Sequence, residues 1–161
     1  MPELPEVETI RRQLEPLIVG KTIVGVEVLN PKSFGGDEGE LIGKRIFLVD
    51  RKGKILILCL KRSDLGVRQG QTLRSEEDIH LFIHLKMSGQ MGYKEEGKRK
   101  KEEGKTKKHL RVRIIFTDRS KLEFYDQRKF GWITDDPAVL PLGIDALDPG
   151  LTIGKLAEIL K

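Results

Sequence analysis

The sequence predicts a mainly β fold with flanking helices, a two-layer β-sandwich that carries an α-helix at its N-terminus. Short runs of alternating apolar and polar residues recur from Thr22 onwards, separated by turns rich in glycine, proline and charge, as expected for strands. A single long helical pattern precedes them, because apolar residues recur at spacings of three and four over residues 7–17. Many short strands with one helix are typical of two packed β layers.

The first element is an amphipathic helix with a recognisable start and end. Pro5 and several glutamates lie in its first turn, where proline loses no hydrogen bond and negative charge is favoured. Gly20 predicts its end. The residues expected to face the core are Val7, Ile10, Leu14 and Leu17.

The strands then follow in chain order. The clearest pair is a hairpin in which the tight turn 118–120 joins residues 109–117 to residues 121–125. Residues 30–37 and 61–78 are predicted loops, and the charged, low-complexity residues 93–108 are predicted to form a hairpin tip. The other predicted strands cover residues 22–29, 45–49, 54–60 and 79–87.

Composition limits the class of protein. The 161 residues suffice for one domain and an appendage, and the net charge of +5 suits a polyanionic partner, although a merely soluble basic protein is the alternative. Cys59, the only cysteine, lies in an apolar run and is expected to be buried. With no apolar run of membrane length and no signal peptide pattern, we expect a cytoplasmic protein with no membrane partner.

Chemistry is expected at the N-terminus. A methionine followed by proline is ordinarily removed, which leaves Pro2 with a secondary amine that titrates far below a lysine side chain. Such an amine can attack a carbonyl or a sugar C1′ to give an iminium, and the adjacent Glu3 can transfer protons. Glu6, one helical turn on, can hold the N-terminus by hydrogen bonds. A plain helix start with proline at its edge is the alternative interpretation.

Three stretches support the chemical interpretation by resemblance. Residues 2–12, PELPEVETIRR, resemble the N-terminus of the formamidopyrimidine-DNA glycosylases, bacterial enzymes that excise oxidised purines from DNA. Residues 84–89, HLKMSG, are similar to the HLGMSG or HLRMTG loop of that family. Residues 126–131, DQRKFG, are similar to its DPRRFG loop, with Gln127 and Lys129 as departures.

The resemblance implies a catalytic set at the start of the chain. The nucleophile would be Pro2 and its acid/base partner Glu3. A family lysine that holds the DNA backbone near the lesion matches Lys54, with Lys52 as the alternative register.

The resemblance also implies a DNA-binding set. Met87 would fill the gap left by an everted nucleotide, where an unbranched apolar side chain offsets part of the cost of base flipping. His84 would contact phosphate. Arg128 would pair with the cytosine left without its partner, and Phe130 would insert beside it.

The family likeness divides the chain into three parts. Residues 1–133 would be the catalytic sandwich, residues 134–150 the linker, and residues 151–161 the start of a helix-two-turns-helix domain, with Thr152 capping a helix that places Leu156, Ile159 and Leu160 on one side. The rest of that domain and the family's zinc ribbon are absent from the sequence, so no metal or other cofactor is expected. Weak, salt-dependent DNA binding and very slow or absent lesion excision are therefore expected.

The implied function is that of a base-excision-repair glycosylase and AP lyase. It would remove formamidopyrimidines and 8-oxoguanine from double-stranded damaged DNA through a Schiff base and β,δ-elimination, as a monomer. The alternatives are a non-catalytic DNA- or partner-binding module, a tautomerase-like enzyme that uses the N-terminal proline as a base, and the related endonuclease VIII type, which prefers oxidised pyrimidines.

Overall fold

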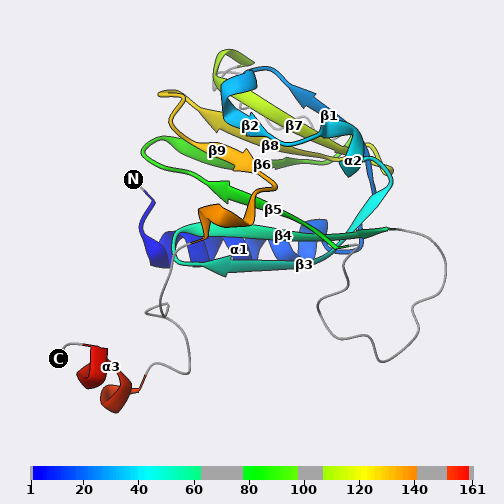
Figure 1. Cartoon of the computed structure of the whole chain (residues 1–161). Helices are drawn as coiled ribbons and strands as arrows, with labels where there is room; N and C mark the ends of the chain where they lie inside the picture. The colour runs from blue at the N-terminus through cyan, green and yellow to red at the C-terminus, as the bar shows by residue number, and fades with distance from the viewer. Residues whose placement is uncertain (1, 63–77, 98–106, 141–151, 160–161) are drawn as a thin grey trace.

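Two β-sheets form the body of the protein. The computed structural model describes residues 2–62, 78–97, 107–140 and 152–159, and within these ranges nine strands pair into a four-stranded and a five-stranded sheet (Figure 1). The predicted mainly β fold of two layers is confirmed. The four-stranded sheet has the order β1 (Ile23–Val28), β7 (Leu110–Phe116), β8 (Lys121–Asp126) and β6 (Gly89–Lys94).

The five-stranded sheet contains the longest strands. Its pairs are antiparallel except that of β2 with β9. Its order is β2 (Phe34–Gly35), β9 (Trp132–Thr134), β5 (Ile79–His84), β4 (Ile55–Arg62) and β3 (Lys44–Lys52). The predicted loop at residues 30–37 was therefore wrong in part, since it contains β2 and the 3-10 helix η1 (Pro31–Ser33).

The predicted hairpin of residues 109–125 is confirmed as β7 and β8. Arg119 adopts a positive φ of 63° in the turn, and Ser120 donates its backbone N–H to Asp118 Oδ1 over 3.0 Å. Alternate side chains of these strands face the other sheet, as their period of two requires. These buried residues are Leu110, Val112, Ile114, Phe116, Leu122 and Phe124.

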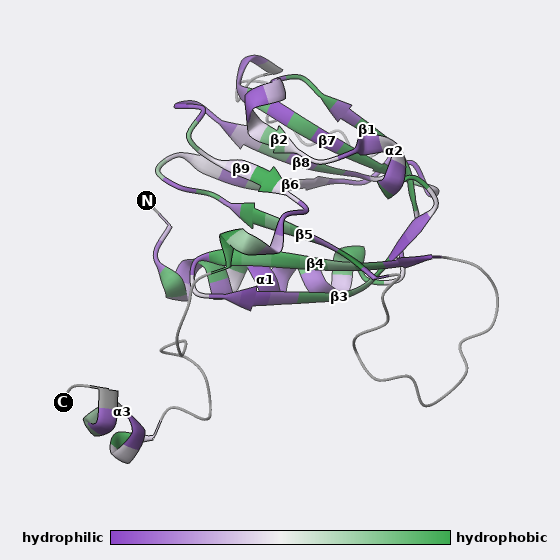
Figure 2. Ribbon diagram, viewed as in Figure 1, coloured by the Kyte–Doolittle hydropathy of each residue, from purple (hydrophilic) through white to green (hydrophobic). Residues whose placement is uncertain are grey.

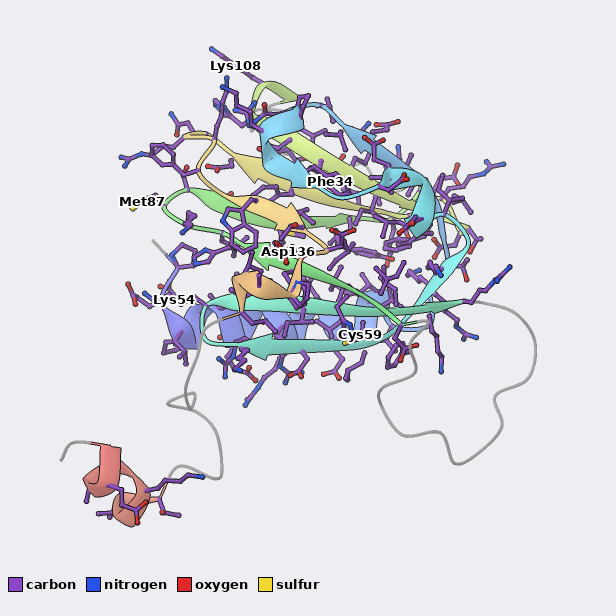
Figure 3. All side chains as sticks on the ribbon, viewed as in Figure 1. Phe34, Lys54, Cys59, Met87, Lys108 and Asp136 are labelled. Carbon is purple, nitrogen blue, oxygen red and sulfur yellow. The ribbon has the colours of Figure 1, made fainter. Side chains whose placement is uncertain are left out.

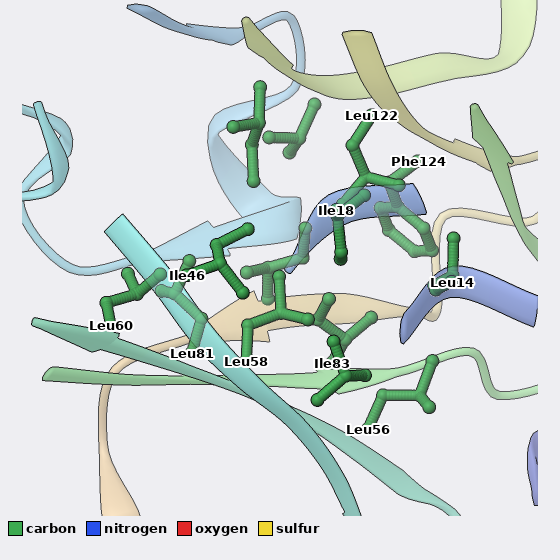
Figure 4. Close-up of a cluster of buried hydrophobic side chains, with 14 of the residues drawn as sticks. Leu14, Ile18, Ile46, Leu56, Leu58, Leu60, Leu81, Ile83, Leu122 and Phe124 are labelled. Carbon is green, nitrogen blue, oxygen red and sulfur yellow. The ribbon is translucent and has the colours of Figure 1, made fainter. Parts of the chain in front are cut away.

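The main core lies between the sheets and against helix α1 (Leu4–Ile18). Apolar side chains from both sheets and from the helix meet there (Figures 2 and 4). Val7 and Leu14 are buried as predicted and Ile10 packs against the core. The prediction for Leu17 was wrong, because it is 36% exposed and its neighbour Ile18 is fully buried.

A second apolar cluster covers the other face of the five-stranded sheet. It contains Ile55, Ile57, Phe82 and Cys59, whose predicted burial is confirmed and raises the pKa of its thiol to about 12. Residues near the short helix η3 (Pro137–Val139) pack onto it.

The remaining helices are short. They are α2 (Glu38–Leu41), η2 (Lys107–His109) and α3 (Ile153–Ile159). Thr152 caps α3 as predicted, since its Oγ1 accepts the Lys155 backbone N–H over 3.2 Å. Leu160 and the side chains of Leu156 and Ile159 lie outside the described residues, as do most of the predicted loops 61–78 and 93–108. No helix in the described ranges is long and apolar enough to cross a membrane.

Candidate active site and nucleic-acid interface

The start of α1 is held by reciprocal hydrogen bonds. Glu3 is the N-cap residue, its backbone N–H donates to Glu6 Oε2 over 2.8 Å, and its side chain accepts the backbone N–H of Glu6. The Glu6 N–H also donates to the Glu3 carbonyl over 3.0 Å, so the capping box adds to a backbone bond at the helix start. It gives Glu6 the anchoring position expected from the sequence and fixes the chain direction at Pro2.

Lys54 completes this corner from the turn between β3 and β4. Its Nζ lies 2.8 Å from Glu3 Oε2. The hydrogen bond and positive charge of Lys54 lower the pKa of the Glu3 carboxyl, which is therefore ionised at neutral pH. Of the two lysines considered, Lys54 and not Lys52 makes this contact. We call Pro2, Glu3, Glu6 and Lys54 the amino-terminal corner.

A pocket of about 450 Å³ opens beside this corner. Pro2, Glu6 and Ile10 line one side, and the turn between β5 and β6 lines the other. Figure 3 shows Lys54 and Met87 at the same end of the molecule. The residues contributed by the turn and β6 are Met87, Ser88, Gly89, Gln90 and Met91.

The turn at residues 85–89, called the Met87 tip, has a tightly determined backbone. The Gly89 N–H donates to the Leu85 carbonyl over 2.8 Å, and a Cβ on Gly89 would lie 2.3 Å from that oxygen, so only glycine fits. Lys86 adopts a positive φ of 51°. Alternation along the strand would place Met87 toward the core, but this turn leaves it 45% exposed at the tip.

His84 lies just before the tip and is half-buried. Its Nδ1 accepts the Lys86 backbone N–H over 3.0 Å, and its ring tilts against Trp132 with centroids 5.5 Å apart. Burial, followed by the charges of Lys86 and Lys54, lowers the pKa of His84 to about 4. The neutral ring therefore carries its proton on Nε2, where it can donate a hydrogen bond.

The loop at residues 127–131, called the Arg128 loop, holds two exposed side chains on a fixed backbone. Arg128 is exposed and Phe130 is 60% exposed. The Gly131 N–H donates to Asp126 Oδ2 over 2.6 Å, and a Cβ on Gly131 would lie 2.6 Å from Phe124 Cζ. Lys129 adopts a positive φ of 61°.

Sequence reasoning missed two sets of residues that support the site. Asp126 and Ser88 connect the Met87 tip to the Arg128 loop, with Ser88 Oγ 2.5 Å from Asp126 Oδ1. The pattern of an aspartate that begins a loop and accepts the N–H two residues on signals an Asx turn, but nothing local indicates its partner Ser88.

The second missed set is an ion-pair network that anchors α1 on β3. Arg51 Nε lies 2.9 Å from Glu8 Oε2, and Glu8 also accepts hydrogen bonds from Arg11 and Arg12. These bonds, with that of Arg11 the strongest, hold the pKa of Glu8 at about 2. The helix that carries the amino-terminal corner is therefore fixed to the sheet that carries Lys54.

Fold and site together define the class of this protein. It is a β-sandwich domain in which Pro2 lines a pocket and two protruding loops, the Met87 tip and the Arg128 loop, carry exposed side chains. No cluster of three metal-ligating side chains occurs in the ranges described above.

Comparison with known proteins gives the family. The formamidopyrimidine-DNA glycosylase N-terminal domain matches residues 1–133. The chain is 35% identical over 179 residues to the formamidopyrimidine-DNA glycosylase of Mycobacterium sp. (strain KMS), with all of this chain and 56% of that protein covered. It is 36% identical over 175 residues to that of Corynebacterium glutamicum (strain R), of which 57% is covered.

A solved structure of the same family has a similar fold. The Lactococcus lactis formamidopyrimidine-DNA glycosylase, non-covalently bound to DNA containing an AP site, superposes with a TM-score of 0.63 at 32% identity, over 82% of this chain and 44% of that one. The chain belongs to the formamidopyrimidine-DNA glycosylase family, and it spans about half the length of the curated relatives it matches.

Proposed function

We propose that the chain is the catalytic part of a DNA glycosylase and AP lyase of base-excision repair that acts on oxidised purines in double-stranded DNA. The observation that carries this proposal is the amino-terminal corner, where Pro2 lines a pocket and the adjacent Glu3 is held by Lys54 at 2.8 Å. On this proposal Pro2 is the nucleophile, Glu3 the proton-transfer group and Lys54 the cation that pairs with it. The family membership and the DNA-bound relative support the same function.

The chemistry follows from these groups. The neutral Pro2 amine attacks C1′ of an everted nucleotide, so that the N–C1′ bond forms, and the damaged base leaves with the electron pair of its bond and takes a proton from solvent. Glu3 begins as a carboxylate, accepts the proton that the amine loses, and returns it to the sugar ring oxygen as the ring opens. The resulting iminium acidifies the C2′–H bond, the regenerated Glu3 carboxylate accepts that proton, and the 3′ phosphate leaves with the electron pair of its bond. Lys54 can hold a phosphate oxygen beside this step.

The two protruding loops suit the opened duplex. Met87 and Phe130 are exposed apolar side chains that can fill the space left by the everted nucleotide. The Arg128 guanidinium can form two hydrogen bonds to the base left unpaired. Neutral His84, with Nε2 as donor, can bind a phosphate oxygen without adding charge.

We also propose that the chain acts as a monomer in the cytoplasm, with residues 1–133 as the catalytic domain, 134–150 as linker and 151–161 as the start of a second domain. Sedimentation of the chain with and without duplex tests this part: a 1:1 complex supports it and a dimer contradicts it.

Borohydride trapping tests the proposed activity. The chain without Met1 is mixed with a duplex that contains an abasic site opposite cytosine, and borohydride reduces any iminium to a stable adduct. We expect an adduct with the unsubstituted chain and none with Pro2→Gly. If mass spectrometry shows that Met1 has been removed and the chain still gives no adduct, the proposal is contradicted. A non-catalytic DNA-binding module is then favoured.

A further inference from the structure

Asp126 is a buried carboxylate at the point where the two protruding loops meet. It ends β8, is 1% exposed, and pairs with Gly89 of β6 in the register of the sheet. The Arg111 guanidinium donates to the backbone carbonyl of Asp126 over 2.7 Å and fixes the end of the strand. A buried carboxylate is costly unless each oxygen has donors, so its partners show what it does.

The donors to Asp126 come from both loops. Oδ2 accepts the Gly131 N–H over 2.6 Å, and Oδ1 accepts the Arg128 N–H over 3.1 Å. Oδ1 also lies 2.5 Å from Ser88 Oγ, one residue after Met87. The Ser88 hydroxyl oxygen in turn accepts the Arg128 N–H over 3.0 Å. The Met87 tip and the Arg128 loop thus share one hydrogen-bonded junction.

A second hydrogen-bonded pair of a serine and an aspartate provides a comparison for the bond between Ser88 and Asp126. At the opposite end of β8, Ser120 Oγ lies 2.5 Å from Asp118 Oδ1, but these residues are two apart and belong to one turn. Ser88 and Asp126 are 38 residues apart and belong to different connections. The same bond therefore closes a single turn in one place and joins two loops in the other.

We propose that Asp126 is a positioning residue that acts through Ser88 to make the Met87 tip and the Arg128 loop enter the DNA as one unit. This inference rests on the proposed function, since it requires both loops to enter the duplex. Asp126 touches no reacting atom. It sets the spacing of two apolar side chains, Met87 and Phe130, that must occupy one opened step of the helix together.

The first test needs no DNA and uses amide hydrogen exchange in the free chain. The reporter is the Gly131 N–H, because its own bond is to Asp126 Oδ2 and not to Ser88. Loss of a hydrogen bond of ordinary strength in Ser88→Ala should speed its exchange about tenfold. Ser88→Thr, which keeps the hydroxyl, should restore protection, and Ser120→Ala, which removes the matched bond at the far end of β8, should leave Gly131 unchanged. Unchanged exchange of Gly131 in Ser88→Ala overturns the proposal.

The second test measures the coupling of the two side chains on DNA. The rate of borohydride trapping on the abasic duplex is compared for Met87→Ala, Phe130→Ala and the double variant, in the unsubstituted and the Ser88→Ala chains. In the unsubstituted chain we expect the trapping rate of the double variant to fall by much less than the product of the two single-variant reductions. In the Ser88→Ala chain we expect it to fall by that full product. Equal non-additivity in both backgrounds overturns the proposal. If the unsubstituted chain gives no adduct, only the proposed function is contradicted. Exchange of the Gly131 N–H then tests the coupling of the Met87 tip to the Arg128 loop.

Discussion

The amino-terminal corner and the Met87 tip meet at one pocket, and the Arg128 loop is hydrogen-bonded to that tip, but the corner and the two loops are built in opposite ways. In the corner the side chains themselves are paired, with Glu3 held by Lys54 at 2.8 Å and by Glu6 through the helix cap. In the loops the backbone is held, and the side chains of Met87 and Phe130 are 45% and 60% exposed. The group that would transfer protons is thus held by an ion pair, although its side chain is 58% exposed, and the groups that would enter the duplex are carried on a held backbone.

This difference separates function from stability in the two regions. Substitutions in the corner change the charges at the pocket as well as a helix cap. Substitutions of the exposed loop side chains should act mainly on contacts with a bound partner. Variants in the two regions test that separation.

The strongest expected loss follows from Glu3→Gln. Glutamine keeps the shape of the side chain but cannot transfer a proton and loses the charge that faces Lys54. Base excision from a duplex with an oxidised guanine should fall by about 10²-fold or more, the usual contribution of a positioned acid or base. Single-turnover release of the base measures this rate.

Glu15→Gln provides the matched control on the same helix. Glu15 pairs with Arg11 at 2.9 Å and does not line the pocket. Excision by this variant should equal that of the unsubstituted chain. A similar loss in both variants would show that the helix, and not the Glu3 carboxyl, limits the reaction.

A smaller effect is expected from Met87→Ala and Phe130→Ala, and only on DNA. Each variant should weaken binding to an abasic duplex about tenfold, because each removes apolar contact in the opened step worth roughly 1–3 kcal/mol. The free energy of unfolding should change by less than about 0.5 kcal/mol, as for other exposed positions. Fluorescence anisotropy and urea unfolding measure the two quantities. A large loss of stability would contradict the separation of the two regions.

The smallest effect concerns His84, which lies between the two regions and feels the charges of both Lys54 and Lys86. Its folded pKa of about 4 lies below its ordinary value of 6.5, so between these pH values the unfolded chain binds a proton that the folded chain does not. Its contribution to stability is therefore complete above pH 6.5 and is lost as the pH falls toward 4.

Two measurements check this prediction. An NMR titration of His84 should show no protonation between pH 7 and 5. Urea unfolding over the same range should lose stability more gradually in His84→Gln than in the unsubstituted chain. A His84 that titrates near 6.5 would contradict the half-buried, neutral ring.

The sequence predicted the elements with strong local patterns. The strands of the 109–125 hairpin, the buried run before Cys59 and the start of α1 all follow from side-chain period, turn residues and capping. Leu17 failed because positions three and four after Leu14 both continue a helical face, and the end of α1 at Ile18 decides which one is buried.

What the sequence could not provide is contact between distant segments. The parallel pairing of β2 with β9 joins two short segments that have no strand pattern of their own. The bond between Ser88 and Asp126 and the network of Glu8 with Arg51 depend on the packing of separate strands and a helix. The residues of the amino-terminal corner could be named from the sequence because the family resemblance indicates them, with Lys54 preferred to Lys52. The contact of Lys54 Nζ with Glu3 Oε2 could not, because it joins the helix start to a turn of the sheet.

The most direct measurement is to locate the sugar in the trapped adduct. The borohydride-reduced complex is digested with protease and nuclease, and tandem mass spectrometry identifies the residue that carries the deoxyribose remnant. Lys54 is the other amine close to the site, because its Nζ lies 2.8 Å from Glu3 Oε2. We expect the remnant on the nitrogen of Pro2 in the N-terminal peptide. A remnant on Lys54, with Pro2 unmodified, would contradict it.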